Sequence, residues 1–305
     1  MNYIDIKHEK IEEAKAIHLH ELTSIITKRI EKYTTSIINK KFFNFHIIPN
    51  LKNILTGGPE ILLELHNELN PKITSSIKKN ILNIFAYQGW FDKKKLKMYD
   101  AYNLASNLDI PTCIYCNRIY TKTVISGSQK ITRPSFDHWF SKESYPLLAL
   151  SFFNLIPSCS ICNSGVKGKT IFALDSHFHP YLKSMDSTLI LDYAFSYDHA
   201  DYSTFKFKII SNNDFSKNSV EAFKLEKIYE MHEDEIKDLR RIRDVYSPHY
   251  LINLKKTLTK ANISEDEIYQ LAFGAYINED LFDRRPLSRM KRDILGELGI
   301  LNHLK

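Results

Sequence analysis

The cysteines of this chain are spaced as ligands of one metal ion. All four stand in two pairs of the same spacing, Cys113-Ile114-Tyr115-Cys116 and Cys159-Ser160-Ile161-Cys162. A gap of two residues lets a tight turn point both sulfurs at one ion, and two such turns fill the four positions of a tetrahedral zinc site. Four thiolates leave no open position for water, so the sequence predicts a structural zinc ion rather than a catalytic one.

The same cysteines have three alternative explanations, which are buried reduced thiols, one redox-active pair, and an iron–sulfur cluster. A redox Cys-x-x-Cys pair needs a thioredoxin-like βαβ setting, and it would leave the second pair without a role. Two separated pairs in a charged segment favour zinc over an iron–sulfur cluster. We therefore expect bound zinc.

Side chains suited to phosphodiester hydrolysis lie between and just after the cysteine pairs. His138 has an intrinsic pKa that lets it accept a proton from water near neutrality, and its neighbour Asp137 offers an oxygen ligand to Mg²⁺ or Mn²⁺. On a regular strand these two side chains point to opposite faces, so one site can use both only if the backbone bends there. Asn154 is expected to tie the connecting loop to the strands and to orient the imidazole, and Asn163 to begin a helix that faces the metal.

This segment of about 57 residues resembles the zinc-containing HNH endonucleases, also called ββα-metal nucleases. The match is an ordered series of Cys-x-x-Cys, Asp137-His138, Asn154-Leu155, Cys-x-x-Cys-Asn163 and a lysine–glycine end. The resemblance implies that His138 is the general base, that Asn154 is the central structural asparagine, and that Asp137 and Asn163 bind a catalytic Mg²⁺ or Mn²⁺. The third signature position is often histidine in that family, and the asparagine here changes the ligand set without implying a dead enzyme. The implied activity is hydrolysis of nucleic acid, with DNA favoured over RNA.

Further basic and histidine side chains near the segment are weaker candidates. Lys167, Lys169 and Arg118 are candidates to contact a substrate phosphate, although a solvated surface position explains each of them equally well. His177 and His179 have the two-residue spacing of metal ligands on a strand, but no further cysteine or carboxylate motif accompanies them. We expect a structural or peripheral role for this histidine pair rather than a second metal site.

The flanks more loosely resemble bacterial HNH proteins that are encoded beside ATPases in phage-defence systems. The resemblance is carried by Cys116-Asn117-Arg118, Tyr120-Thr121 and the segment from Leu148 to Pro157. It implies an antiviral effector held in check by an ATPase partner. The rival hypothesis is a non-catalytic zinc-ribbon module that binds nucleic acid or protein, and it leaves the nuclease order of Asp137, His138 and the two asparagines unexplained.

The net charge and the length of the chain are compatible with both the nuclease and the zinc-ribbon hypotheses and do not decide between them. The net charge of +6 and the pI of about 8.9 favour a polyanionic partner, but the excess is small for 305 residues. The basic runs at 93–97, 240–243 and 284–292 are each explained by solvated helix faces when taken singly. The N-terminus lacks the apolar segment of a secretory signal and no apolar run is long enough to span a bilayer, so we expect a cytoplasmic protein without a membrane partner.

The expected fold class is α+β, with a zinc-stabilised ββα-metal nuclease module between helical flanks. Residues 1–105 form the helical N-terminal region, 106–185 the zinc-binding nuclease module, and 186–305 a short β-hairpin followed by helices. In the first region, apolar residues recur at helical spacing from Glu9 to Ile38, with His18 near the buried stripe, and a second helix is expected from Glu60 to Leu69.

Strands are expected only in the middle and third regions. Residues 118–125 and 131–138 are rich in β-branched and aromatic side chains on either side of a turn, which predicts a hairpin. Residues 188–195 and 205–209 predict a second strand pair. Ser264 to Glu267 forms the capping box of a late helix.

Overall fold

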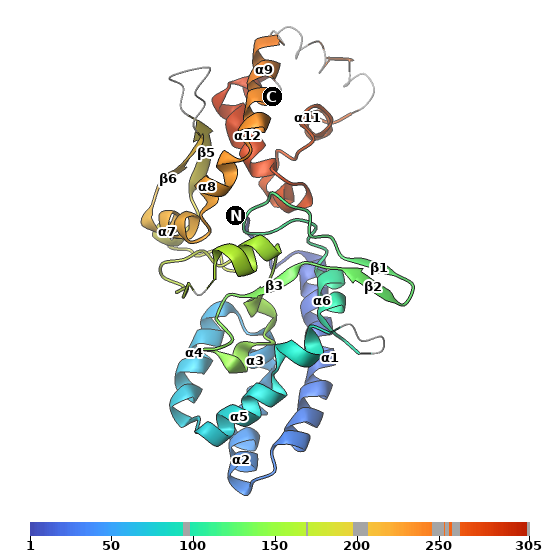
Figure 1. Ribbon diagram of the computed structural model, residues 1–305, viewed down its shortest axis with the longest axis vertical. Helices are drawn as coiled ribbons and strands as arrows, with labels where there is room; N and C mark the ends of the chain where they lie inside the picture. Colours follow the sequence, from blue (N-terminus) through green and yellow to red (C-terminus); the bar gives the residue numbers. More distant parts are fainter. Residues whose placement is uncertain are drawn as a thin grey trace.

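The computed structural model describes residues 1–93, 98–168, 170–197, 207–245 and 263–303, together with Asn253, Lys256 and Thr257. Figure 1 shows an elongated molecule with the N-terminal helices at one end, short strands in the middle and the C-terminal elements at the other end. Helices predominate, and the strands of the described residues form three separate antiparallel pairs. This mixture of helices and small sheets is compatible with the predicted α+β class.

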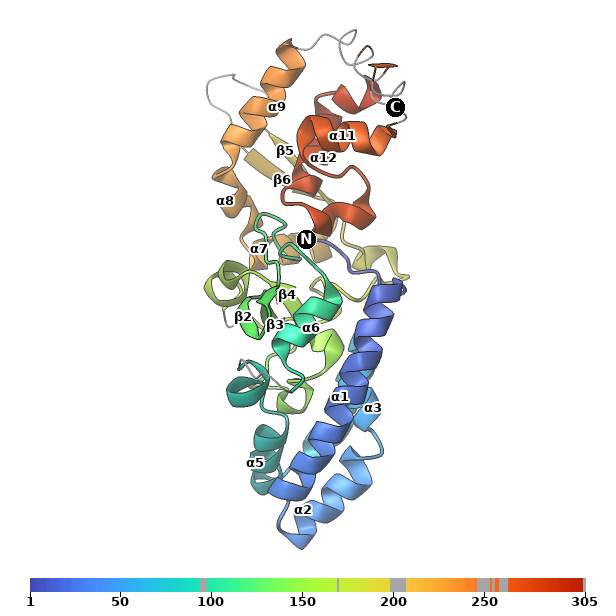
Figure 2. The ribbon, with the colours of Figure 1, turned by 90° about the vertical axis from the view of Figure 1, so that its right-hand side faces the viewer.

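The longest helix, α1 (Glu9–Tyr33), is the predicted amphipathic helix, but it ends at Tyr33 instead of continuing to Ile38. It ends there because Ser36 caps a new helix, α2 (Ile37–Phe42), by accepting the backbone N–H of Asn39 at 3.1 Å. One stripe of α1 is buried, and its members are Ile11, Ala14, His18, Leu22, Ile26 and Ile30. Figure 2 shows α1 running along the lower half of the molecule beside the other N-terminal helices.

His18 is a core residue, as its place on the apolar stripe predicts. Its side chain is fully buried, and its Nε2–H donates to the carbonyl of Leu150 at 2.8 Å. Its Nδ1 accepts from the hydroxyl of Tyr99 at 3.1 Å. Both ring nitrogens are satisfied, so α1 is joined by hydrogen bonds to the loop that carries the candidate site.

The rest of the N-terminal region is helical, as predicted. The helix expected from Glu60 to Leu69 is α4, which starts one residue earlier because Pro59 suits the first turn of a helix. The other elements are η1 (Phe43–Ile47), α3 (Leu51–Thr56), α4 (Pro59–Leu69), η2 (Asn70–Lys72), α5 (Ser75–Ile84), η3 (Tyr87–Phe91) and α6 (Ala101–Leu108).

Two short strand pairs form the middle of the molecule. β1 (Val124–Ser126) and β2 (Gln129–Thr132) make a hairpin across Gly127, whose φ of +56° suits glycine. β3 (Ser135–His138) pairs with β4 (Leu155–Ser158). Short helical turns occupy the connections, and they are η4 (Pro146–Leu148), η5 (Phe152–Asn154) and η6 (Ile161–Val166).

The predicted hairpin of residues 118–125 with 131–138 is therefore only partly present. Only Val124 and Ile125 of the first segment lie in a strand, β1, and the second segment is divided into β2 and β3. Pro134 lies at the division, and proline interrupts a strand ladder because it has no N–H to donate. β3 takes its partner from residues 155–158, a segment for which we predicted no strand.

The C-terminal region begins with a strand pair, as predicted. β5 (Tyr193–Tyr197) and β6 (Phe207–Ser211) are antiparallel, although the expected first strand starts later because residues 187–189 form the turn η7 (Ser187–Leu189). The predicted capping box is present at Ser264, at the start of α11. The helical elements are α7 (Asp214–Ala222), α8 (Leu225–Glu230), α9 (Glu233–Val245), α11 (Glu265–Phe273), η8 (Glu279–Arg284), α12 (Ser288–Glu297) and η9 (Ile300–His303).

The basic side chains of the C-terminal run, residues 284–292, bond to other groups of the chain and do not form a solvated face. Arg284 pairs with Asp109 at 3.1 Å, and Arg292 pairs with Glu279 at 2.7 Å. Arg289 donates to two backbone carbonyls, at 3.0 and 2.9 Å. These guanidinium groups are occupied within the chain, so they do not form a ready surface for phosphate. In the first basic run, residues 94–97 lie outside the described residues.

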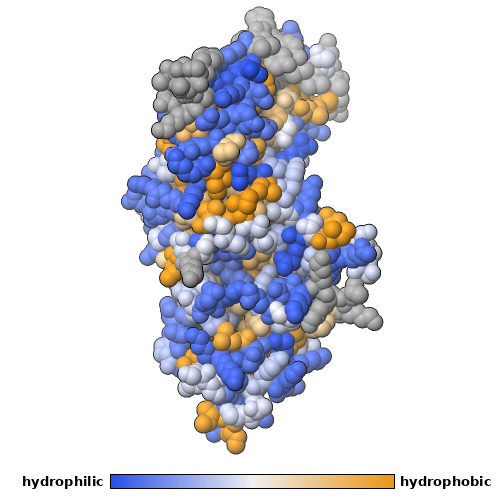
Figure 3. Space-filling view, in the orientation of Figure 1, coloured by the Kyte–Doolittle hydropathy of each residue, from blue (hydrophilic) through white to orange (hydrophobic). Residues whose placement is uncertain are grey.

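Figure 3 shows one face of the molecule, which is mostly hydrophilic with apolar residues gathered near its middle and at its lower tip. α2 lies at the lower tip (Figure 1), and its Ile37 and Ile38 are each 74% exposed. Among the described residues, no helix is both long and apolar enough to cross a membrane.

Candidate metal centre and functional site

The four cysteines converge in the middle of the molecule, as their spacing predicts. Their sulfur atoms all lie within 4.8 Å of one another, and every one of the four residues is buried. The Sγ atoms of Cys116 and Cys159 are 3.9 Å apart, close to the roughly 3.8 Å that a tetrahedral site with Zn–S bonds of about 2.3 Å requires. The four thiols are free of disulfides. The donor set therefore fits a metal ion such as zinc.

Local backbone geometry explains how each pair forms a turn. After the first pair, Asn117 adopts a φ of +50°, a left-handed conformation that asparagine tolerates better than most residues, and its N–H donates to the carbonyl of Cys113 at 2.8 Å. In the second pair, the N–H of Cys162 points at the sulfur of Cys159 at 3.4 Å. Burial is the largest cause that raises the pKa of the Cys113 thiol, and a bound cation would favour its thiolate form.

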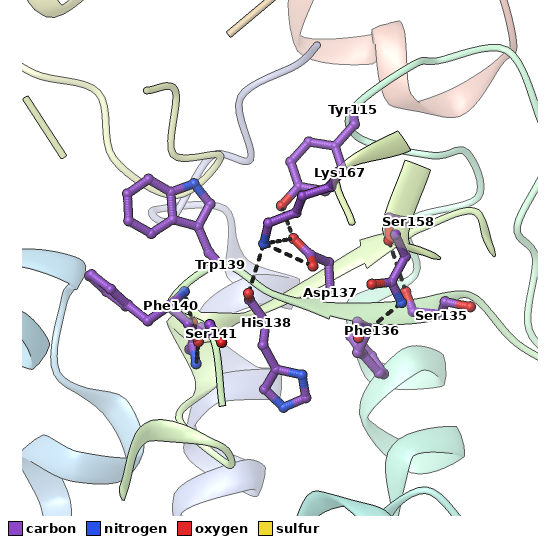
Figure 4. Close-up of polar contacts among 12 residues, drawn as sticks. Tyr115, Ser135, Phe136, Asp137, His138, Trp139, Phe140, Ser141, Ser158 and Lys167 are labelled. Atoms are coloured by element: carbon purple, nitrogen blue, oxygen red, sulfur yellow. Dashed lines mark hydrogen bonds and ion pairs between the residues drawn. The ribbon is translucent and has the colours of Figure 1, made fainter. Parts of the chain in front are cut away.

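Both cysteine turns contribute a side chain to the carboxylate of Asp137. Tyr115, inside the first pair, donates its hydroxyl to Oδ2 at 2.7 Å. Lys167, just after the second pair, donates to Oδ1 at 2.9 Å and to Oδ2 at 2.7 Å. Figure 4 shows this arrangement above β3. The side chains of Asp137 and Lys167 are each only 6% exposed, so the ion pair is screened from water.

The Lys167 amine has a third partner, the backbone carbonyl of His138, at 2.8 Å. Burial lowers the pKa of this amine, and the Asp137 carboxylate opposes that shift. Burial and the same carboxylate raise the pKa of Tyr115 well above its usual range, so its hydroxyl keeps the proton that it donates. Together the two cysteine turns saturate the carboxylate with donors.

His138 lies on the opposite face of β3 from Asp137, as strand geometry predicts and Figure 4 shows. Its Nε2 is 3.0 Å from the carbonyl of Ala149, and because a carbonyl can only accept, Nε2 carries the proton. The Nδ1 atom of the neutral ring is then the acceptor. The edge of Tyr87 meets the imidazole at a centroid distance of 4.7 Å. Asp137 and His138 are thus neighbours in sequence whose side chains do not meet.

Burial is the main cause that lowers the pKa of His138 to about 4. The carbonyl of Ala149 and the charge of Asp137 oppose this shift, whereas the charges of Lys142 and Lys167 add to it. At neutral pH the imidazole is therefore uncharged. It can accept a proton without first losing one, which is the state a general base requires.

Asn154 ties the loop between β3 and β4 to itself, whereas we predicted that it ties this loop to the strands and orients the imidazole directly. Its Oδ1 accepts from the N–H of Phe140 at 2.6 Å, and its Nδ2 donates to the carbonyls of Phe140 at 3.1 Å and Leu148 at 2.9 Å. The residue is fully buried. The imidazole is oriented by Ala149, next to Leu148 in this loop, so Asn154 acts on His138 only through the loop.

Asn163 lies on η6, which follows β4, and its side chain is half-buried. Its Nδ2 donates to the carbonyl of Phe136 at 3.5 Å, a long hydrogen bond to β3. This hydrogen bond uses the amide nitrogen, whereas the predicted metal ligand is the amide oxygen. Among the described residues, the four cysteines form the one close group of His, Cys, Asp or Glu side chains able to hold a metal.

Two of the three candidate phosphate contacts, Lys167 and Arg118, are bonded to other groups of the chain. The amine of Lys167 is buried on Asp137, so it does not present its charge to solvent. Arg118 directs its Nη1 to His232 at 2.9 Å and to the carbonyl of Ile228 at 3.4 Å, which ties it to α8 and the turn after it. Lys169 lies outside the described residues.

His177 and His179 have structural roles, as expected. His179 is 1% exposed, packs against the ring of Trp139 at 4.7 Å, and accepts the N–H of Tyr181 at 3.2 Å. Burial, followed by the charge of Lys167, lowers the pKa of His179 to about 3. His177 stacks on Phe172 at 4.8 Å.

Sequence reasoning missed the contributions of Tyr115, Tyr87 and Lys142. Tyr87 and Lys142 help to line a cavity of about 310 Å³ next to Ala149, the partner of His138. The other lining residues are Leu82, Phe85, Ala86, Gln88, Glu143, Pro146 and Ala149. No local sequence signal marks these positions, because α5 and η3 meet the loop after β3 only through tertiary packing.

Comparison of the chain with protein-family models, with curated proteins and with solved structures finds no match.

Proposed function

We propose that this chain is an HNH-type endonuclease that hydrolyses phosphodiester bonds in nucleic acid, with DNA favoured over RNA. The observation that carries the proposal is the state of His138, whose Nε2–H is held by the carbonyl of Ala149 while the Nδ1 lone pair is left to accept a proton. The order of elements supports it, because β3, β4 and the turn η6 follow one another as two antiparallel strands and a helix beside the cysteine cluster.

In the proposed reaction, Nδ1 of His138 takes a proton from a water molecule whose oxygen bonds to phosphorus. The phosphorus–oxygen bond to the leaving nucleotide breaks in the same step, and solvent water protonates the departing alkoxide. The carbonyl of Ala149 then stabilises the imidazolium, because Nε2 keeps its donor role in both protonation states. A bound phosphate would raise the low pKa of this ring toward neutrality, since a nearby negative charge favours the protonated form. Lys142, whose charge acts on His138 and which lines the adjoining cavity, is suited to hold that phosphate.

The cysteine cluster serves this proposal as a structural centre. We assign it to zinc because four buried thiols in tetrahedral reach of one another are the usual ligands of that ion. The ion would fix the two turns that carry Tyr115 and Lys167, and through them the position of Asp137.

The resemblance assigns a catalytic Mg²⁺ or Mn²⁺ to Asp137 and Asn163, and the arrangement described above does not accept that ion. Both carboxylate oxygens of Asp137 already receive hydrogen bonds from the buried amine of Lys167. We therefore derive no catalytic step through a divalent ion from this geometry.

This saturation favours one rival function, a non-catalytic zinc module that binds nucleic acid or protein. A cleavage assay separates the two, using duplex DNA, single-stranded DNA and RNA with Mg²⁺ or Mn²⁺. Under the proposal, His138→Ala lowers the cleavage rate by about 10²-fold or more, since a general base contributes on the order of 10²–10⁴-fold. His177→Ala is the matched control, because His177 packs on Phe172 and away from β3. Equal cleavage by the His138 and His177 variants would refute the proposal.

The proposal extends to a regulatory role with an ATPase partner in bacterial phage defence, as the looser resemblance implies. The exposed apolar side chains of Ile37 and Ile38 on α2 support a protein contact, because exposed apolar patches mark interaction surfaces. Co-purification of the wild-type chain and an Ile37→Asp/Ile38→Asp variant with the neighbouring ATPase tests it. Equal retention of the ATPase by both chains would remove α2 from the interface.

A further inference from the structure

Three oxygen atoms surround the Lys167 amine as they would surround a hard cation. They are the two carboxylate oxygens of Asp137, at 2.9 and 2.7 Å, and the backbone carbonyl of His138, at 2.8 Å. An ammonium group has three N–H donors, so each has one acceptor. The ammonium is thus a complete occupant of this oxygen cluster, and Figure 4 shows it over β3 between the carboxylate and the His138 carbonyl.

A divalent ion cannot share this cluster with the ammonium. Mg²⁺ requires oxygen ligands at about 2.0–2.1 Å, which would bring it into contact with an amine that holds the same oxygens. The two cations would also repel each other strongly in a buried place, where the effective dielectric constant is low. Either the amine or the ion can occupy the carboxylate, but not both.

We infer that the Lys167 ammonium is a built-in occupant of the catalytic cation site, and that a divalent ion binds Asp137 only after Lys167 has been displaced. The inference rests on the proposed nuclease function for the site's role. It makes the described structure the metal-excluded, resting form of the enzyme. It also explains why a carboxylate expected to bind metal is saturated with donors.

The local backbone provides a route for the displacement. Lys167 follows η6, a π-helical turn, and precedes Gly168, whose φ of +52° ends the helical path. Ser164, Gly165 and Gly168 are exposed, so the buried side chain of Lys167 has exposed neighbours in sequence. The displacement that we infer is a rotation of the Lys167 side chain away from Asp137 and toward these exposed neighbours, where the sequence predicts a phosphate contact.

The test measures Mn²⁺ binding to zinc-loaded protein by electron paramagnetic resonance, a readout that needs no cleavage. Lys167→Met removes the charge and keeps much of the apolar side chain. This variant is expected to bind one Mn²⁺ on the order of 10²-fold more tightly than wild type, because wild type must first break a buried ion pair. Adding Asp137→Asn to Lys167→Met should remove that tight site. Lys72→Met is the matched control and should bind Mn²⁺ as wild type does, since Lys72 pairs with Glu68 on the surface and is not among the donors to Asp137.

Two outcomes would overturn the inference. In the first outcome, wild type and Lys167→Met have the same affinity for Mn²⁺, and the substitution Asp137→Asn in wild type removes the binding. This outcome would show that the Lys167 amine does not prevent Mn²⁺ from binding to Asp137. The other is a folded, zinc-loaded Lys167→Met chain without a tight Mn²⁺ site. If Lys167→Met does not fold, Lys167→Gln takes its place, and the comparison of wild type with Asp137→Asn still decides the first outcome.

Failure of the inference and failure of the proposed function give different results. Tight Mn²⁺ binding by Lys167→Met without cleavage of any nucleic acid would support the cation site and refute the nuclease. Cleavage that depends on His138, together with an overturning Mn²⁺ result, would support the nuclease and refute the displacement of Lys167.

Discussion

Replacing Asn154 by alanine tests whether the loop between β3 and β4 depends on one buried amide. The substitution removes three hydrogen bonds, which join the side chain to the N–H and C=O of Phe140 and to the C=O of Leu148. The carbonyl of Leu148 also accepts from the N–H of Ser151 at 3.1 Å, so that group keeps a partner. The substitution therefore removes the Asn154 partner of two backbone groups, the N–H and the C=O of Phe140. Each of these buried groups then carries the full free-energy cost of an unsatisfied polar group.

The magnitude follows from these two groups. A buried polar group without a partner costs about 1–3 kcal/mol, so Asn154→Ala should lower the free energy of unfolding by about 2–6 kcal/mol. Asn163→Ala is the matched control, because that amide is half-buried and makes one hydrogen bond of 3.5 Å. Its expected loss is below about 1 kcal/mol.

Urea unfolding followed by circular dichroism measures both variants, with zinc content checked on the same samples. Cleavage at a temperature where Asn154→Ala is folded should also fall, because the carbonyl that orients His138 belongs to the loop that Asn154 holds. The reasoning is refuted if the two alanine variants lose similar amounts of stability.

Three further predictions address the centre and the core. Cys116→Ser should lower the zinc content, measured by elemental analysis, and the melting temperature, measured by calorimetry. Ser160→Ala, inside the second pair, should change neither quantity. A zinc-free wild type would contradict the assignment. Tyr115→Phe should lower the free energy of unfolding by about 1.5–3 kcal/mol in urea, because it removes a hydrogen bond to a buried carboxylate, and a neutral result would show that Asp137 does not need this donor. Burial lowers the pKa of His18 from 6.5 to about 4 in the folded chain. As the pH falls, the imidazole is therefore protonated in the unfolded chain before it is protonated in the folded chain. The free energy of unfolding should fall by about 3 kcal/mol between pH 6.5 and pH 4. His18→Phe should lose less stability than wild type over that pH range, and parallel curves would contradict the burial argument.

The sequence alone determined the features that depend on local spacing. Two Cys-x-x-Cys pairs predict a shared tetrahedral site because each pair forms its own local turn. The four cysteines of the two turns are together the four ligands that one such site requires. The apolar stripe of α1 predicts the buried place of His18, since helical periodicity alone decides which side chains face the core. The capping box at Ser264 predicts the start of α11 for the same local reason.

Tertiary structure decided which segments meet, and therefore the chemistry around β3. Alternation along a strand predicts that Asp137 and His138 face opposite ways, but it does not say that β3 pairs with β4 or what each face meets. The donors to Asp137 come from 22 residues before it and 30 residues after it. The carbonyl that orients His138 lies 11 residues further along the chain. These contacts depend on how the cysteine turns and the connecting loop pack against β3, and no pattern within any one segment contains that information.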